Sequence, residues 1–211
     1  VWMARDVLSN RTSTPEWWHI GALADGEVPN SMVFSGDGDV LFVGTSAGRV
    51  HRFSNLINAR SEESADVDIN FLVNPPAVST AIVENRVIFN QSGRSITGIV
   101  TDQNDADRLI ITLGNYGSNL NHVYYTEQAT SVTLNSSGFI SKDGDLPALP
   151  VDDAVFNYND ANNGQVILGT DLGIFTTNDI TASSVSWAVD NNGFANVPVF
   201  DLIQTRTVRY D

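Results

Sequence analysis

The sequence contains no cysteine, which excludes disulfide bonds, thiolate nucleophiles and thiolate metal sites. Its three histidines, His19, His51 and His122, lack a metal-ligand spacing such as i, i+4, and this argues against a zinc site. Neither a Gly-rich phosphate loop nor a Gly-x-Ser-x-Gly nucleophile elbow occurs. The common sequence signatures of catalysis are therefore missing.

Basic residues are scarce, because 11 Lys and Arg stand against 25 Asp and Glu, for a formal net charge of -14. Such an acidic surface repels phosphate backbones and anionic membranes, so nucleic acid is not an expected partner. No apolar run approaches the roughly 18 to 20 residues of a membrane span, which predicts no membrane insertion. With 211 residues, 42% of them hydrophobic, the chain can form one domain with a sizeable core.

What the sequence does contain is a repeated hairpin. In the stretch QVILGTDLGIFTTND, residues 165–179, two β-forming runs flank a turn rich in Gly and Asp. The same pattern occurs at residues 39–55, where Gly-Thr at 44–45 matches Gly-Thr at 169–170. A third copy, at residues 108–128, has a longer turn. The hairpin is therefore an internal repeat.

A strand-like segment precedes each hairpin, starting at Asn30, Ile96 and Val151, and a fourth such segment begins at Val199. Spacings of roughly 50 to 65 residues suit units of about four strands each. No segment shows a sustained helical period of apolar residues, so helices are predicted to be absent or short. The chain is therefore predicted to be all-β.

Tandem four-stranded antiparallel units with short apolar innermost strands predict a β-propeller, with about four blades' worth of sequence. The predicted parts are an outer half-blade at 1–29, blades at 30–95, 96–150 and 151–197, and an inner half-blade at 198–211. The C-terminal inner strands could complete the N-terminal outer ones and close four blades. Membership of a larger ring is favoured, because the chain ends where the next hairpin should start. A β-sandwich is the structural rival, but it does not explain the repeat.

The turn after the last hairpin is similar to an Asp-box, the pattern Ser-x-Asp-x-Gly-x-x-Trp. TTNDITASSVSW keeps Thr177, Asp179 and a displaced Trp187, with Thr181 in place of Gly, and ARDVLSN keeps Asp6. The units thus resemble the Asp-box, or BNR-like, propeller repeats of sialidases and sortilin-type receptors. In their amino-acid sequence, the last two units look most similar to large propeller proteins exported by type IX secretion in gliding bacteria. This resemblance implies export to the cell surface or the extracellular medium, and it implies no reaction.

In that family the Asp-box lies in a peripheral turn, away from the channel. The resemblance therefore implies structural roles for Asp6 and Asp179, which would fix their turns, and for Trp17, Trp18 and Trp187, which would pack between sheets. Sialidase chemistry is not expected, because no arginine of the chain falls in a catalytic motif of that family.

Acidic residues supply the remaining candidates for a site. Asp153 and Asp201 take equivalent positions on two inner strands and could face one channel, as a glycosidase carboxylate pair does. Their neighbour Asp152 points to the opposite strand face from Asp153. Oxygen-rich turns give four candidate calcium ligands, although Asp and Asn are also ordinary turn residues. These candidates are Asp37, Asp39, Asp105 and Asp107.

Together these features predict a noncatalytic, secreted or cell-surface propeller module whose blade-connecting loops bind a protein or a glycan. Two alternatives stay open. One is an extracellular glycan-active enzyme whose carboxylates come from separate blades, and the other is a structural segment of a surface assembly. Apart from calcium, no cofactor is indicated, and the sequence leaves the oligomeric state open.

Overall fold

The computed structural model describes residues 1–4, 17–58, 83–117, 120–134, 136–160, 162, 164–193 and 195–204. These residues form strands and turns without a helix, which confirms the all-β prediction. None of them belongs to a helix long and apolar enough to cross a membrane.

The strands form three four-stranded antiparallel sheets and a two-stranded one, and in each the strands follow chain order. The first sheet contains β3 (Pro29–Phe34), β4 (Leu41–Thr45), β5 (Arg49–Ser54) and β6 (Glu84–Asn90). The second contains β7 (Ile96–Asp102), β8 (Asp105–Leu113), β9 (Val123–Thr126) and β10 (Ile140–Ser141). The third contains β11 (Val151–Phe156), β12 (Val166–Thr170), β13 (Gly173–Thr177) and β14 (Ala188–Val189). The two-stranded sheet pairs β1 (Trp2–Ala4) with β2 (Trp17–His19).

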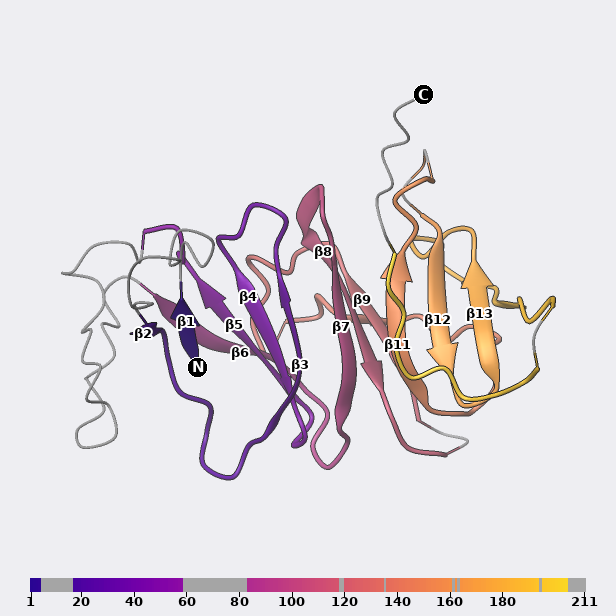
Figure 1. Ribbon diagram of the computed structural model, residues 1–211, viewed down its shortest axis with the longest axis horizontal. Coiled ribbons are helices and arrows are strands. Elements are labelled where there is room, and N and C mark those ends of the chain that lie inside the picture. The colour runs from indigo at the N-terminus through magenta and orange to yellow at the C-terminus, as the bar shows by residue number, and fades with distance from the viewer. Residues whose placement is uncertain are drawn as a thin grey trace, which may run out of the picture.

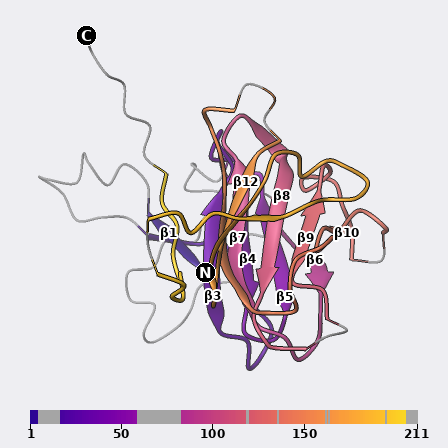
Figure 2. The same ribbon diagram turned by 90° about the vertical axis from the view of Figure 1, so that its right-hand side faces the viewer.

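The three large sheets lie face to face in a row, with the β1–β2 pair at one end and the third sheet at the other (Figure 1). The first strands of neighbouring sheets pack on each other, β3 on β7 and β7 on β11. We call β3, β7 and β11 the inner strands. Figure 2 looks along the row and shows β3 and β7 on one side and the late strands β6 and β10 on the other.

The hydrophobic core lies in layers between the sheets, because successive side chains of a strand point to opposite faces. In β4, Phe42 joins the core between the first and second sheets, while Leu41 and Val43 join the core on the opposite face. A third core lies between the second and third sheets. Each sheet is therefore held by apolar contacts with its neighbours in the row.

Each inner strand has a β-bulge at its second residue. β3 pairs with β4 through Pro29–Thr45 and Ser31–Gly44, and the register skips Asn30. The registers of β7 and β11 skip Thr97 and Asp152 in the same way. The skipped residues are therefore equivalent positions in the three sheets. A bulge changes the direction of the side chains beside it.

A glycine beside each bulge lets the neighbouring inner strand come close. A β-carbon on Gly44 would lie 2.5 Å from Ile96 Cγ2, and one on Gly169 would lie 2.6 Å from the Val199 carbonyl oxygen. The second sheet reverses the arrangement, because there the glycine is Gly98 on the inner strand and its partner is Thr112. The predicted match of Gly44 with Gly169 is confirmed by the two registers.

Replacing Gly44 by alanine should destabilise the protein by about 1 to 3 kcal/mol, because the new methyl group overlaps Ile96 and Ile99 in a packed layer. Urea denaturation measures the loss. Gly114→Ala is the matched control, since its β-carbon would meet nothing closer than a Thr97 methyl at 3.2 Å. Equal free energies of unfolding for Gly44→Ala and the wild type would contradict the close approach.

Candidate functional site

A cleft of about 310 Å³ opens beside the inner strands. All three inner strands contribute to its lining, and both predicted channel carboxylates, Asp153 and Asp201, lie in it. We call it the inner cleft. Its other lining residues are Ser31, Met32, Ile99, Val100, Ala154, Val155, Tyr158, Leu202, Ile203 and Gln204.

Residues 198–204 lie against β11 in the way that β7 lies against β3. The Leu202 N–H donates to Asp153 Oδ2 at 2.9 Å, and the Ile99 N–H donates to Ser31 Oγ at 3.0 Å. Ser31 and Asp153 occupy equivalent positions, each one residue after the bulge. Asp153 therefore fixes the next segment of backbone, although this segment is not assigned as a strand.

Asp153 and Asp201 form a carboxyl pair. The pKa of Asp153 is raised, chiefly by burial. Backbone N–H groups of Leu202 and Ala154 lower this pKa, whereas interaction with the Asp201 carboxyl raises it further. Both acids line one cleft, and Asp153 is already engaged by the Leu202 N–H.

A second carboxyl pair forms at the bulge of β11. Burial raises the pKa of Asp152 to about 6, and the charge of Asp171, a hydrogen bond with it and the charge of Asp153 add to the rise. The Tyr116 hydroxyl donates to Asp171 Oδ2 and thereby joins the β8–β9 loop to the β12–β13 turn. Asp152 Oδ2 is buried and has no hydrogen-bond partner in the described part of the chain.

Sequence reasoning missed Tyr116 and Asp171 as members of this cluster. The two residues lie on turns of different sheets, and they meet Asp152 only because the register skips that residue. A skip in register leaves no mark in the apolar pattern. The only available signal was the neighbouring acidic pair at 152–153.

Large apolar side chains are exposed along the side of the row of sheets at which the inner strands begin. We call this side the loop face; it lies along the lower edge of Figure 1. Scattered apolar residues are ordinary on a protein surface, whereas contiguous exposed apolar patches can serve as binding surfaces. The exposed residues on these loops are Val28, Tyr116, Leu120, Leu172 and Val197.

A buried carboxylate, paired with a partly exposed arginine, holds one loop of this face in place. Glu27, just before β3, accepts a hydrogen bond from Arg49 Nη1 at 2.7 Å, and its other oxygen lies 2.7 Å from His51 Nε2. Burial opposes the charge of Glu27, yet hydrogen bonds from Arg49 and His51 hold the pKa of Glu27 below its usual value. His51 Nδ1 lies 3.2 Å from Asn85 Oδ1. The loop is therefore tied to the first sheet by charged and polar contacts.

Two of the Asp-box-like residues, Asp179 and Trp187, lie beside strands of the third sheet and are not among the residues that line the inner cleft. Asp179 Oδ1 accepts hydrogen bonds from the Thr181 N–H and hydroxyl, which closes the turn after β13. Trp187 is buried in the core between the second and third sheets, and its Nε1 donates to the Lys142 carbonyl at 2.9 Å. Asp6 lies outside the described residues, as do the side chains of Trp17 and Trp18, whose backbone is part of β2.

The four candidate calcium ligands accept hydrogen bonds from backbone and hydroxyl groups, two of them within their own turns and two from distant segments. Asp37 Oδ1 accepts from the Asp39 N–H, and Asp105 Oδ1 accepts from the Asp107 N–H. Asp39 and Asp107 in turn accept from Ile57 and Thr130. Across the described ranges, no group of three or more His, Asp or Glu side chains is placed to hold a metal ion.

No protein-family model matches the chain, and no curated protein matches it. Among solved structures, the GH74 enzyme of Niastella koreensis is similar with a TM-score of 0.51 and 15% sequence identity, over 81% of this chain and 24% of that enzyme. The Cps50 (Swd1) β-propeller domain of Myceliophteria thermophila is similar with a TM-score of 0.48 and 14% identity, over 81% and 41% of the two chains. The chain folds as a β-propeller.

The three large sheets are its blades, and the chain spans about a quarter of the length of the GH74 enzyme. The likeness to the GH74 enzyme concerns the fold alone, because the identity is low. The Asp-box assignment of the turns and the blade boundaries drawn from the sequence stay predictions.

Asp152→Asn should gain stability over the wild type as the pH rises. The folded state raises the pKa of Asp152 from 3.8 to about 6, so its stabilising contribution is full below about pH 3.8 and is lost as the pH rises through 6. Between pH 4.5 and 7.5 the variant should gain about 1 kcal/mol, less than the about 2 kcal/mol that an unscreened shift gives over this range, because Asp152 is partly exposed. Urea denaturation at both pH values measures the difference.

Asp160→Asn supplies a control of opposite sign. Backbone N–H groups of Gln165, Asn162 and Gly164 lower the pKa of Asp160, so its contribution is present above its unfolded pKa and is lost as the pH falls. The Asn variant should therefore be less stable than the wild type at pH 7.5. A stability difference between Asp152→Asn and the wild type that does not change with pH would contradict the account.

Asp153→Ala should release residues 198–204 from the third blade, because it removes the acceptor of the Leu202 N–H. Amide hydrogen exchange should accelerate at Leu202 by at least about tenfold, the factor that corresponds to about 1.4 kcal/mol. Asp153→Asn keeps an acceptor oxygen and should retain most of the protection. Unchanged exchange at Leu202 in the alanine variant would show that the segment does not depend on this hydrogen bond, and that contacts such as the one from the Val199 N–H to the Thr170 carbonyl hold it instead.

Proposed function

We propose that this chain is a noncatalytic β-propeller module, exported to the cell surface or the medium, that binds a protein or a glycan through its loop face. The observation that carries the proposal is the set of exposed apolar residues on the loop face. Two of these residues, Tyr116 and Leu172, lie on turns of neighbouring blades that the Tyr116–Asp171 hydrogen bond joins. Rigid loops with exposed aromatic and aliphatic groups bind at low entropic cost.

Export rests on the resemblance of the turns to Asp-box repeats, and the excess of acidic residues is compatible with it. A noncatalytic role is supported by the carboxylates of the inner cleft. Asp153 accepts the Leu202 N–H at 2.9 Å and thereby holds a backbone segment, which is a structural role. The fold shared with a GH74 enzyme does not alter this, because a fold does not imply a function.

Fluorescently labelled protein added to the cells from which the sequence derives tests the proposal. Tyr116→Ala and Leu172→Ala should each reduce binding at least tenfold, because both side chains are exposed on the loop face. Ile140→Ala is the control, since Ile140 is comparably exposed on the outer strand β10. Pretreating the cells with protease or with periodate separates a protein partner from a glycan.

Two results would contradict the proposal. One is equal binding, or no binding, by the wild type and all three variants. The other is release of reducing ends from a panel of soluble polysaccharides that Asp153→Asn abolishes, which would make the chain a glycan-active enzyme.

A further inference from the structure

Every basic side chain in the described part of the chain is engaged within the protein. Two of them, Arg49 and Arg86, pair with Glu27 and Glu84. The other four are buried and donate to carbonyl, carboxylate or hydroxyl oxygens of the protein: Arg52, Arg94, Arg108 and Lys142. No described base is therefore left to neutralise the remaining carboxylates of this acidic chain.

On the loop face, uncompensated acidic groups lie beside exposed apolar ones. Tyr116, on the β8–β9 loop, is 68% exposed, and its hydroxyl donates to Asp171 on the β12–β13 turn. Asp171 in turn hydrogen-bonds Asp152, and the next residue, Leu172, is 52% exposed. Leu120, on the same loop as Tyr116, is exposed as well. We call these five residues, which join the second and third blades, the junction patch.

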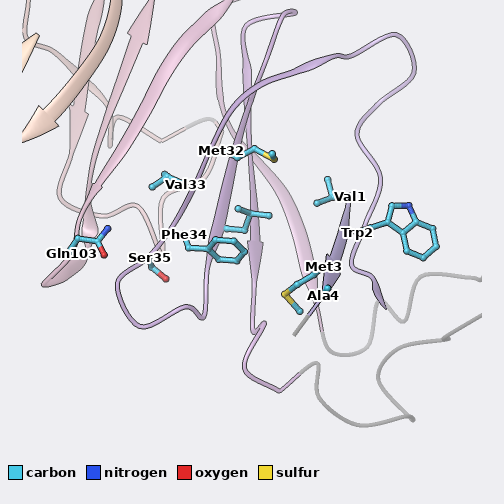
Figure 3. A pocket seen from close by; sticks show the side chains of 10 residues that line it. Val1, Trp2, Met3, Ala4, Met32, Val33, Phe34, Ser35 and Gln103 are labelled. Atoms are coloured by element: carbon cyan, nitrogen blue, oxygen red, sulfur yellow. The ribbon is translucent and has the colours of Figure 1, made fainter. Parts of the chain in front are cut away.

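The apolar groove of about 660 Å³ between residues 1–4 and β3 lacks this combination. Apart from Ser35 and Gln103, the side chains labelled in Figure 3 are apolar, and no charged side chain lines the groove. Phe34, which is 45% exposed there, is thus an accessible aromatic group in an uncharged lining. It provides a comparison for Tyr116, whose hydroxyl is bonded to a carboxylate.

Both ends of the β8–β9 loop are fixed, and this holds Tyr116 in place. The buried Arg94 donates to the Asn121 carbonyl and, at 3.0 Å, to the Gly114 carbonyl. The Tyr116 hydroxyl adds a third attachment, to the β12–β13 turn of the next blade. The junction patch is therefore formed before a partner arrives, which lowers the entropic cost of binding.

The two carboxyls of the junction patch favour a cationic ligand. Asp152 and Asp171 are in hydrogen-bond contact, and no ion pair of the described residues includes either acid. When both ionise, two like charges lie together, and a cation relieves their repulsion whereas a neutral sugar hydroxyl does not. The described residues also hold no group of three side chains suited to a metal ion, so an organic cation fits this place.

We propose that the junction patch binds an arginine-bearing segment of a partner protein, with the guanidinium group over the Tyr116 ring and against the Asp171 carboxylate. A guanidinium group is planar, stacks on aromatic faces and pairs with carboxylates. Apolar side chains next to the arginine would cover Leu120 and Leu172. The inference rests on the function proposed above and deepens it, because it names a protein rather than a glycan as the partner.

A labelled peptide of alternating arginine and leucine is the probe, and fluorescence anisotropy measures its binding to the full chain. At about 0.15 M salt, long-range attraction to the acidic surface is screened. Binding should still be saturable there. The same peptide with citrulline in place of each arginine keeps the shape but loses the charge, and it should bind at least about fivefold more weakly.

On the protein side, Tyr116→Ala and Asp171→Asn should each weaken peptide binding at least about fivefold. Tyr116→Phe keeps the aromatic face and should retain most of the binding. Phe34→Ala is the aromatic control, and Asp105→Asn makes the same change of net charge where β8 begins, at the end of the second sheet away from the loop face. Both controls should bind the peptide as the wild type does. Circular dichroism spectra that overlay that of the wild type would establish that each variant is folded.

Peptide binding should also strengthen between about pH 5 and pH 7.5. Asp152 faces Asp171 and the Tyr116 hydroxyl from the neighbouring turns, and Asp153 follows it on β11. Because the pKa of Asp152 is raised to about 6, this carboxyl loses its proton over that range and adds a negative charge to the patch. Asp152→Asn should remove most of the pH dependence.

Three results would overturn the inference. The first is the absence of saturable peptide binding, and the second is equal weakening by Asp171→Asn and Asp105→Asn, which would show that binding follows net charge alone. The third is binding of the labelled protein to cells that requires Tyr116 and Leu172 but is abolished by periodate and unaffected by excess peptide. That result would assign the loop face to a glycan and leave the proposed function standing, whereas cell binding that survives Tyr116→Ala and Leu172→Ala would contradict the proposed function itself.

Discussion

The close approach of neighbouring inner strands is the constraint on which the rest of the structure depends. Glycines at 44, 98 and 169 remove the side chain that would hold two blades apart, and the bulges turn short polar side chains toward the next backbone. Apolar layers then fill the space between the blades. The polar residues of the inner strands therefore serve mainly to connect neighbouring blades.

This constraint explains why an acidic residue at the axis is poor evidence of catalysis here. Asp153 stands where the first blade has Ser31, and both side chains accept a backbone N–H from the following segment. Burial and a neighbouring carboxyl raise the pKa of Asp153 and of Asp152, as they would in an active site. The hydrogen bond from the Leu202 N–H, rather than a pKa shift, shows what Asp153 does here.

Much of the fold could be predicted from the sequence, because each repeat has a recognisable local pattern of residues. Apolar alternation and Gly-Thr turns located the hairpins at 39–55 and 165–179, and the pairing of β4 with β5 and of β12 with β13 agrees. The Tyr116–Asp171–Asp152 cluster could not be predicted, because it joins turns of two blades across a register skip.

The most direct test of this account is an NMR measurement of distances across the inner strands. The account predicts nuclear Overhauser effects from the Ile99 amide to the Ser31 β-protons and from the Leu202 amide to the Asp153 β-protons, since each amide donates to that side chain. Both effects together would establish that the same hydrogen bond, from a backbone N–H to the side chain that follows the bulge, recurs between successive blades. The account would be contradicted if the Ile99 amide showed its contact with Ser31 while the Leu202 amide had a random-coil chemical shift and exchanged rapidly with solvent.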